Sequence, residues 1–408
     1  MNFNWFIAKK IIFQRTLFKG YSKSILIIGI SAIAIGITSM LIALGTGTGL
    51  QKKISEKISM FNGQVLVTDM QNMKSHQTLK SIENSAKITY DLNKLKSVNH
   101  VQNIGYIGGL AVKGGTFEGI IFKGIDSTYN KKFNYFIKNP TEKKSLKTNE
   151  IWISKNLSRK FGVGIDDFLQ IYFYSEDILF PKRRTLKITS LFETDFSDYD
   201  KNFIIGHIEV IRSILNWNKS QVGGLEIFFD SNSNLEKKTE EIYDSIEDFL
   251  SVRSVNEQFS EIYSWINLFN YNISLIIIIM IFVGGINMIT SLLALIIEQT
   301  NMIATVRILG SSIKSVQKIF LIQGAYLITI GLFFGNVIGL SFLIIQEFTG
   351  IISLNPETYY VKKVPVYINF SSVLLINLIT FFSCMLFLLI PTYVITKMSP
   401  IKSISLNK

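Results

Sequence analysis

Four long apolar stretches limit what this chain can fold into more than any other feature of its sequence. They cover residues 24–45, 271–297, 319–345 and 374–395. Each provides the roughly 20 residues that an α-helix needs to cross the hydrocarbon core of a bilayer. A buried helix of a soluble protein rarely holds so many apolar residues without a charge. The sequence therefore predicts an α-helical membrane protein with four transmembrane helices.

The charges of the short segments predict how the helices cross the membrane. Lys and Arg outnumber Asp and Glu in residues 1–23, 298–318 and 396–408, and short loops rich in these basic residues stay on the cytoplasmic side. Both termini are therefore expected inside. The four remaining assignments are an interfacial helix at 1–23, a cytoplasmic coupling loop at 298–318, an extracytoplasmic loop at 346–373 and a cytoplasmic tail at 396–408.

Residues 46–270 form the large polar block of the chain, and we expect them to be an extracytoplasmic α+β domain. They balance 29 Lys and Arg with 27 Asp and Glu, so most of the net charge of +12 belongs to the membrane part. This basicity is typical of topology and lipid-headgroup contact, and it does not indicate a nucleic-acid surface.

Signatures of catalysis are mostly missing from the sequence. Its three histidines, His76, His100 and His207, have no second ligand at a metal-site spacing, and no G-x-x-x-x-G-K-[ST] motif for ATP occurs. The run Gly45–Gly49 follows an apolar helix and lacks the lysine, so we interpret it as a flexible helix exit. Cys384 is expected to be a packing residue. The chain is predicted to be no enzyme and to carry no catalytic residue, metal or cofactor, with ATP and Mg on a partner.

Small residues recur at helical spacing in the first and third stretches. Such faces let two backbones approach closely where lipid gives no hydrophobic drive for association. The two sets are Gly29, Ala32, Gly36, Ser39 and Ala43, and the tandem G-x-x-x-G of Gly331, Gly335 and Gly339. They predict helix packing, either within the bundle or between two protomers.

Large apolar residues on the other sides of the first helix predict a face towards a lipid or lipoprotein cavity. The candidates are Ile37, Met40, Leu41 and Leu44, together with Leu275 and Ile279 of the second stretch. In the fourth stretch, Pro391 predicts a kink or a local opening, because proline removes a backbone donor.

The segment between the second and third stretches, residues 298–318, is too long for a simple turn. It shows a short helical pattern that breaks at Gly310. Its amphipathic character suggests that it docks a cytoplasmic partner, an ATPase subunit. The predicted docking residues are Met302, Ile303, Thr305, Val306, Arg307, Leu309, Gly310 and Ser311.

Several motifs of the chain occur in the order and spacing of a known family. They are Ile303-Ala304 with Arg307 and Leu309-Gly310-Ser311, Asn355-Pro356 with Tyr359-Tyr360 and Val364-Pro365-Val366, Gly124-Ile125-Asp126, Glu150-Ile151-Trp152-Ile153 with Phe161-Gly162-Val163, Asp200, and Pro400 near the C-terminus. Together they resemble the lipoprotein-releasing (LolC/LolE-type) ABC transporter permeases of the FtsX/MacB-like superfamily. Where many members have an acid, this chain has Met302.

The resemblance implies an outer domain of two parts. A porter-like part is expected at 47–104 and 216–266, with a strand-rich part inserted at 105–215. The sequence pattern itself predicts strands at 64–68, 109–113, 119–124, 150–154, 169–174 and 184–191 and a helix at 234–250. The absence of a repeat signal argues against a β-barrel.

The resemblance also implies function and partners. It implies a multi-pass permease of the bacterial inner membrane that extracts lipoproteins from the outer leaflet, with a periplasmic domain and a separate cytoplasmic ABC ATPase dimer. A second permease copy or a sibling permease, membrane lipids and a periplasmic chaperone are the further partners. The loop that would contact the chaperone is 175–184, with Asp177, Ile178, Leu179, Phe180 and Pro181; an ordinary hairpin loop is the alternative.

Two other functions stay open at this point. A permease of the same fold could move a cell-wall hydrolase or an efflux channel. Alternatively, the chain could be a membrane receptor without any ATPase.

Overall fold

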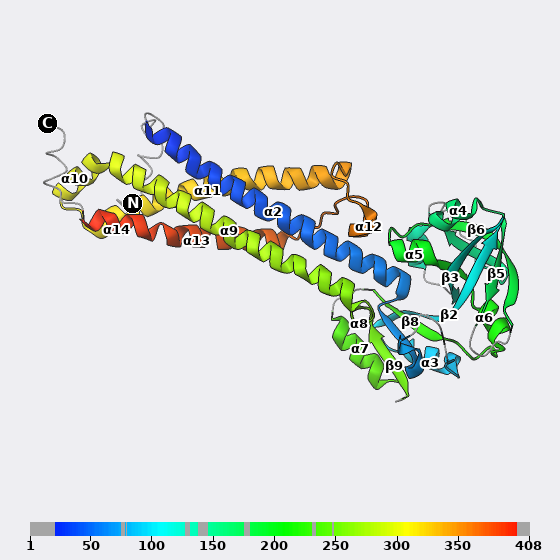
Figure 1. Cartoon of the computed structure of the whole chain (residues 1–408). Helices are drawn as coiled ribbons and strands as arrows, with labels where there is room; N and C mark the ends of the chain where they lie inside the picture. Colours follow the sequence, from blue (N-terminus) through cyan, green and yellow to red (C-terminus); the bar gives the residue numbers. More distant parts are fainter. Residues whose placement is uncertain are drawn as a thin grey trace. The chain divides into compact units, whose positions relative to one another are not determined.

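The computed structural model describes residues 21–74, 78, 80–126, 131–137, 146–174, 180–230, 234–246 and 249–397. The chain divides into two compact units (Figure 1). The helical unit contains the chain up to Lys52, residues Trp265–Ser353 and the chain from Lys363 onwards. The sheet unit contains Lys53–Ser264 and Leu354–Lys362. Residues 1–20 of the predicted interfacial helix at 1–23 and most of the tail at 396–408 lie outside the described residues.

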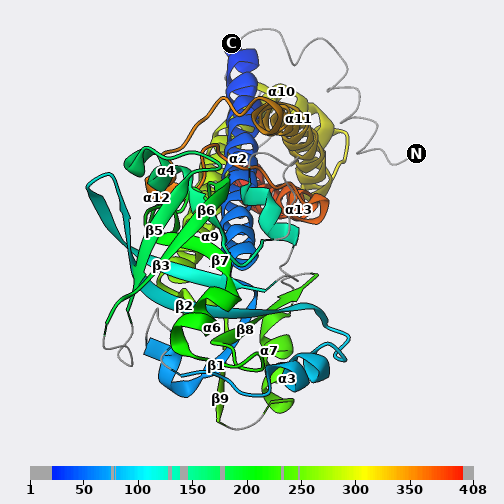
Figure 2. The same ribbon diagram turned by 90° about the vertical axis from the view of Figure 1, so that its right-hand side faces the viewer.

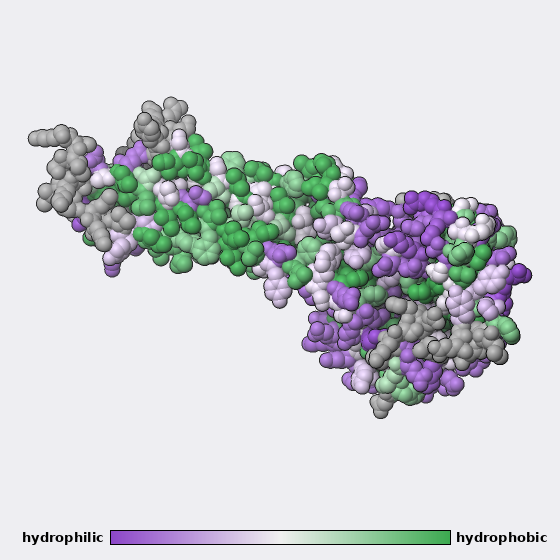
Figure 3. All heavy atoms as spheres, viewed as in Figure 1, coloured by the Kyte–Doolittle hydropathy of each residue, from purple (hydrophilic) through white to green (hydrophobic). Residues whose placement is uncertain are grey.

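The helical unit is built on α2 (Tyr21–Asn62), α9 (Ser260–Glu298), α11 (Ile313–Thr349) and α13 (Phe370–Phe387) with α14 (Leu389–Lys397). Among the described residues, four helices are long and apolar enough to cross a membrane. Figure 3 shows apolar side chains over most of the visible face of this unit. The four predicted apolar helices are confirmed, and three of them extend well beyond the apolar stretches.

The tandem glycines of α11 pack against α2. A Cβ atom built on Gly331 would lie 2.8 Å from Ile33, and one built on Gly339 would lie 3.1 Å from Leu41. At Gly335, a Cβ would collide with Ile37. The hydroxyl of Thr38 also donates to the carbonyl of Gly335 at 3.0 Å. The glycines therefore form holes on α11 that large residues of α2 fill.

The structure corrects the predicted cavity on α2. Ile37, Met40 and Leu41 are fully buried inside the bundle, and Leu44 packs against the same core. Ile37 and Leu41 fill the space left by Gly335 and Gly339, and Met40 lies against Thr380 of α13, so these side chains face protein rather than a cavity. Gly29 and Gly36 of α2 instead face α9, where a Cβ would meet Ser291 and Met280 respectively.

The run Gly45–Gly49 is helical, contrary to the interpretation as a flexible exit. α2 continues through it to Asn62. Cβ atoms built on its three glycines would come, in order, against Leu343, Ile273 and the carbonyl oxygen of Pro365. Glycine is present here because three neighbouring segments approach the α2 backbone closely, not because the chain needs flexibility.

The fourth helix is interrupted near Pro391, as predicted. α13 ends at Phe387, and α14 begins at Leu389. A proline at position 391 cannot donate to the carbonyl of Phe387 and crowds it, which explains why the break falls at this turn.

The sheet unit holds nine strands in the described residues. They are β1 (Val65–Asp69), β2 (Val98–Lys113), β3 (Thr116–Ile125), β4 (Glu150–Ser154), β5 (Phe168–Phe173), β6 (Lys182–Phe192), β7 (Phe203–His207), β8 (Gly224–Phe229) and β9 (Leu250–Ser254). The helices are η2 (Met70–Lys74), α3 (Ser85–Leu92), η3 (Lys131–Phe136), α4 (Lys155–Phe161), α5 (Ser197–Asn202), α6 (Ile208–Leu215), α7 (Leu235–Asp244), α8 (Val255–Gln258) and α12 (Pro356–Tyr359).

Six of these strands close into a small barrel (Figure 2). The hydrogen-bonded order β3-β7-β4-β6-β5-β2 returns to β3. Side chains that alternate along the strands fill its interior, among them Phe122, Ile153, Ile171 and Ile188. The argument against a barrel was therefore wrong, because a six-stranded ring with unequal strands needs no sequence repeat.

Strand β2 joins this barrel to the rest of the sheet. Ile104 pairs with Ile125 of β3 on one edge and with Gly224 of β8 on the other, so the strand belongs to the barrel and to the remaining sheet at once. Beyond it, β8, β1 and β9 extend the sheet. The six predicted strands are confirmed, whereas β7, β8 and β9 were not predicted. The helix expected at 234–250 ends at Asp244, and Leu250 begins β9.

The α2–α11 contact gives a direct test. In Gly335→Leu, the new side chain must displace Ile37 from a fully packed position, so we expect a loss of about 1–3 kcal/mol or more in the free energy of unfolding. Thermal unfolding of the purified chain in detergent measures it. Val337→Leu, at a 48 % exposed position of the same helix, is the control and should unfold like the parent. Equal unfolding temperatures for both variants would contradict the packing described here.

Candidate functional site

A short helix, α10 (Thr300–Ile308), lies between α9 and α11. Its inner side chains belong to the core of the helical unit. Ile303, Ala304 and Val306 are buried, and Ile303 and Val306 share a cluster with Phe320 of α11. This burial holds α10 against the bundle. Ile303 and Val306 therefore do not belong to the predicted docking surface, because they hold the helix in place.

The outward surface of α10 is apolar at its C-terminal end. Ile308 is 65 % exposed and Leu309 is 79 % exposed. Thr305 is exposed one turn earlier, and Gly310 follows with φ +96°, a conformation that favours glycine. We define the α10 surface as Thr305, Ile308, Leu309 and Gly310.

The other predicted docking residues lie around this surface. Met302 is half-buried and packs against the core, while Arg307 and Ser311 are half-exposed beside it. Ile308 was missed from the sequence, although its spacing of three from Thr305 could have found it. An exposed isoleucine and leucine side by side at the end of a polar segment are typical of a surface that another protein covers.

A second apolar surface runs along α9. Leu275, Ile279, Phe282 and Ile286 are exposed at helical spacings of three and four. They form one continuous apolar stripe along α9, in which Phe282 contacts Phe387 of α13. Of the six predicted cavity residues, Leu275 and Ile279 belong to this stripe. α9 therefore presents an outward apolar face, as α11 and α13 also do, whereas Ile37, Met40 and Leu41 of α2 are buried.

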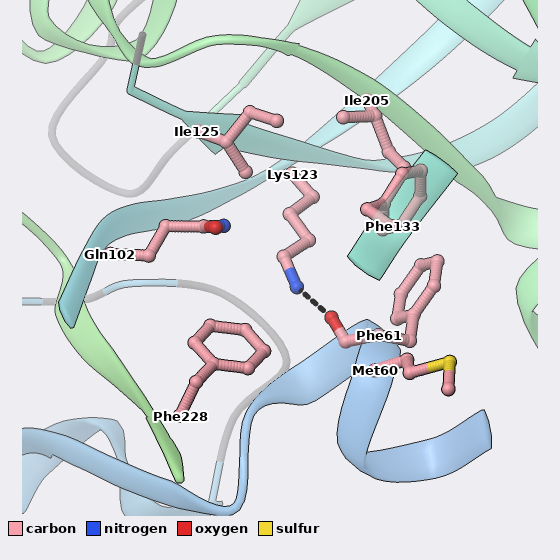
Figure 4. A pocket seen from close by; sticks show the side chains of 8 residues that line it. All are labelled: Met60, Phe61, Gln102, Lys123, Ile125, Phe133, Ile205 and Phe228. Carbon is pink, nitrogen blue, oxygen red and sulfur yellow. Dashed lines mark hydrogen bonds between the residues drawn. The ribbon is translucent and has the colours of Figure 1, made fainter. Parts of the chain in front are cut away.

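A buried ionic network anchors the end of α2 within the sheet unit. The ammonium of Lys123 donates to the carbonyl of Phe61 and lies 2.6 Å from the carboxylate of Glu226. Tyr106 donates to the same carboxylate at 3.0 Å. Figure 4 shows Lys123 pointing at Phe61 among the side chains that line a small cavity. The last carbonyls of a helix lack partners within it, and Lys123 supplies one.

Burial dominates the protonation of this network. It raises the pKa of Glu226 and of Tyr106 and lowers the pKa of Lys123, while the attraction between Lys123 and Glu226 opposes both shifts of the pair. The cavity beside it is too narrow for a substrate, so the arrangement fits an anchor and not a catalytic centre. Sequence reasoning missed it because the three residues lie on different strands.

Aromatic rings surround the same end of α2. Phe61 stacks on Tyr199 with ring centroids 4.3 Å apart, and the amide of Asn62 donates to the Tyr199 hydroxyl at 2.6 Å. Next to it, Asp200 accepts from the backbone N–H and the hydroxyl of Thr194. Asp200, singled out by the resemblance, therefore shapes the turn after β6.

The predicted chaperone loop connects β5 and β6. Asp177, Ile178 and Leu179 lie outside the described residues. Phe180 is 80 % exposed, and Pro181 is exposed beside it. The two residues directly precede β6. Among the described residues, no three His, Cys, Asp or Glu side chains gather in a way that could hold a metal ion.

Known proteins resemble the chain in both units. Residues 274–400 match the family model of the FtsX-like permease C-terminal region, and residues 26–242, more than half of the chain, match the MacB-like periplasmic core domain.

Similar curated proteins carry the name lipoprotein-releasing system transmembrane protein LolC. The one from Buchnera aphidicola subsp. Schizaphis graminum is 24 % identical over 94 % of this chain and 94 % of its own length. The one from Neisseria meningitidis serogroup B is 23 % identical over 88 % and 89 %. The one from Buchnera aphidicola subsp. Acyrthosiphon pisum is 27 % identical over 84 % of each chain.

The ionic anchor makes a testable prediction. Lys123→Met leaves Glu226 buried without its cation, which should cost about 3–5 kcal/mol in the free energy of unfolding. Because burial raises the pKa of Glu226 in the folded state, the folded variant binds the proton more tightly than the unfolded chain. Its stability should therefore fall further as the pH rises above the ordinary carboxyl range.

The double variant Lys123→Met/Glu226→Leu is the control, since it removes both charges. It should recover much of the lost stability and should lack the added pH dependence. Thermal unfolding of the full chain in detergent at several pH values measures each variant. A single variant as stable as the parent at all pH values would contradict the anchor.

Proposed function

The chain belongs to the family of permeases that join a MacB-like periplasmic core domain to an FtsX-like C-terminal region, and from this premise we propose that it extracts lipoproteins from a bacterial membrane. In this proposal it is the permease subunit of an ABC transporter in the inner membrane. It takes lipoproteins from the outer leaflet and passes them to a periplasmic chaperone. The names of its relatives support this substrate class.

The α10 surface is the observation that carries the transporter part of the proposal. Its buried face fixes α10 to the bundle, and its exposed face presents Ile308 and Leu309. A rigidly held apolar surface of this kind suits a partner that pushes on the bundle. In our proposal that partner is a cytoplasmic ATPase dimer, which carries the ATP and Mg, so this chain is no enzyme and needs no cofactor.

The energetics explain why such a partner is needed. A buried CH₂ group contributes about 0.8 kcal/mol, so each long acyl chain holds a lipoprotein in the membrane by roughly 10 kcal/mol. Release of a substrate with two or three chains therefore needs both an apolar path and an external source of energy. The α9 stripe, with Leu275 and Ile279, supplies an apolar face for the path.

The proposal also includes a second permease subunit and a periplasmic chaperone. A second permease copy or a sibling permease completes the path by covering the exposed apolar face of α9. The loop between β5 and β6, with its exposed Phe180, contacts the chaperone. Both termini lie on the cytoplasmic side, and the sheet unit is periplasmic.

A permease of this family that moves a cell-wall hydrolase or an efflux channel is the second candidate. The α10 surface suits it equally well, since the same ATPase contact would drive it. A receptor without an ATPase is less favoured, because it gives no reason for an apolar α10 surface.

The docking surface is tested by Leu309→Asp. The new carboxylate would be buried without a partner at the ATPase contact, so we expect co-purification of the ATPase subunit to fall by at least about tenfold. Since Leu309 is exposed, the chain itself should unfold like the parent. Leu309→Met is the matched control and should keep the ATPase. An intact complex with Leu309→Asp would sink the proposed docking surface.

The substrate class is tested by depletion of the protein in its own cells. Labelled lipoproteins should then accumulate in the inner membrane instead of reaching the outer membrane, which membrane fractionation measures. Expression of the parent chain should restore sorting, and Leu309→Asp should not. Normal sorting together with altered cell-wall turnover or drug sensitivity would favour the second candidate.

A further inference from the structure

The loop between α11 and α13 contributes a small lobe, residues 354–362, to the sheet unit. Its two ends are joined by a hydrogen bond from the N–H of Leu354 to the carbonyl of Lys362 at 2.9 Å. Inside it, Asn355 caps α12 by accepting from the N–H of Glu357 at 3.0 Å. The lobe is thus closed on itself, and other contacts must hold it to the rest of the sheet unit.

Lys57 of α2 makes the first of these contacts. Its buried ammonium donates to three acceptors: the carboxylate of Asp195 at 2.7 Å, the carbonyl of Thr194 at 3.1 Å and the carbonyl of Tyr360 at 3.1 Å. An ammonium has three N–H donors, and here each has an acceptor. Lys57 therefore ties the lobe to the turn that follows β6.

Side chains of the lobe make the second set of contacts with the same turn. The ammonium of Lys362 lies 2.6 Å from Glu193 and 3.0 Å from Asp195, and the ring of Tyr360 stacks on Phe196 with centroids 4.6 Å apart. Burial favours the neutral form of Lys362, but its hydrogen bonds to Glu193 and Asp195 outweigh this and raise its pKa. Lys362 is nevertheless 48 % exposed, so water can replace its partners.

Both residues that Lys57 brings together have unusual backbones. Asp195 has φ +65° and Tyr360 has φ +58°, a region that residues other than glycine adopt at a cost. Asp195 is held there from one side by Asp200, which accepts from its N–H at 3.2 Å, and from the other by Lys57. Such positions persist only where the surroundings fix them, and they cluster at switch regions.

We propose that Lys57, Lys362, Tyr360 and the turn Glu193–Phe196 form a releasable clasp that must open when the transporter works. Water can reach the Lys362 pairs, whereas opening must also break the buried contacts of Lys57, after which the two strained residues can relax. Opening frees the segment that connects α11 to α13 from the sheet unit. This inference rests on the proposed function, because it assigns the clasp a step in that transport cycle.

The clasp is tested by locking it shut. Glu193→Cys and Lys362→Cys are combined in a Cys384→Ala background and bridged by a reducible bis-methanethiosulfonate reagent of about the length of the ion pair. The complex with its ATPase subunits is placed in proteoliposomes, and release of a fluorescent lipoprotein is followed. We expect the bridged complex to release it at least about tenfold more slowly, with full recovery after reduction. Each single-cysteine variant, treated alike, is the control.

The outcomes separate this inference from the proposed function. Release at the unbridged rate from a fully bridged complex would overturn the clasp. If even the unbridged complex releases no lipoprotein, the proposed function fails, and the ATP hydrolysis rate then decides on the clasp. Slower hydrolysis in the bridged complex would support the clasp, and unchanged hydrolysis would overturn it.

A second measurement needs no partner. In Lys57→Met the lobe loses its central contact, so trypsin should cut after Lys362 or Lys363 at least about threefold faster in the full chain in detergent. Lys53→Met, one turn earlier on α2, is the matched control, and Lys57→Arg should retain most of the protection. Equal cleavage of Lys57→Met and the parent would show that Lys57 does not hold the lobe.

Discussion

The packing and anchoring of α2 is the constraint on which the rest of the structure depends. Within the helical unit, large α2 side chains fill the holes left by the glycines of α11, and close backbone contacts continue through Gly45–Gly49. Lipid gives no hydrophobic drive for helix association, so this fit must supply the attraction. Within the sheet unit, the last turn of α2 ends on the buried ammonium of Lys123. α2 is therefore held by close side-chain packing in the helical unit and by a hydrogen bond from a buried charged group in the sheet unit.

The sequence predicts the helical unit well because its signals are local. Apolar length gives the four helices, and the spacing of Gly331, Gly335 and Gly339 identifies a packing face. The spacing does not show which helix packs against these glycines. Ile37 and Leu41 look equally suited to lipid and to a protein hole, and only the position of α11 decides. For the same reason Ile303 and Val306 were assigned to the docking surface although they are buried, and the exposed Ile308 was missed. Which side of a nine-residue helix faces the bundle is decided by tertiary packing.

The sheet unit is harder to predict because its signals are distant in sequence. The short strands β7 and β8 are buried along nearly their whole length, so they lack the alternation that marks a half-exposed strand. Lys123 and Glu226 resemble ordinary solvated charges until the fold brings them together, 103 positions apart. The order of motifs in a family could single out Asp200, but only the structure shows that it shapes a turn.

Two ionic contacts of the sheet unit differ in how firmly they hold. Lys123 and Glu226 are shielded from water, and separating such a pair leaves an uncompensated buried charge, a loss of about 3–5 kcal/mol. Lys362 is half-exposed, and pairs of that kind contribute only about 0–1 kcal/mol. Lys57, one helical turn before Phe61, is buried and has three acceptors, so the half-exposed Lys362 pair is the weak joint of the clasp. A force on the lobe would therefore open the weak joint first and leave the end of α2 seated in the sheet unit.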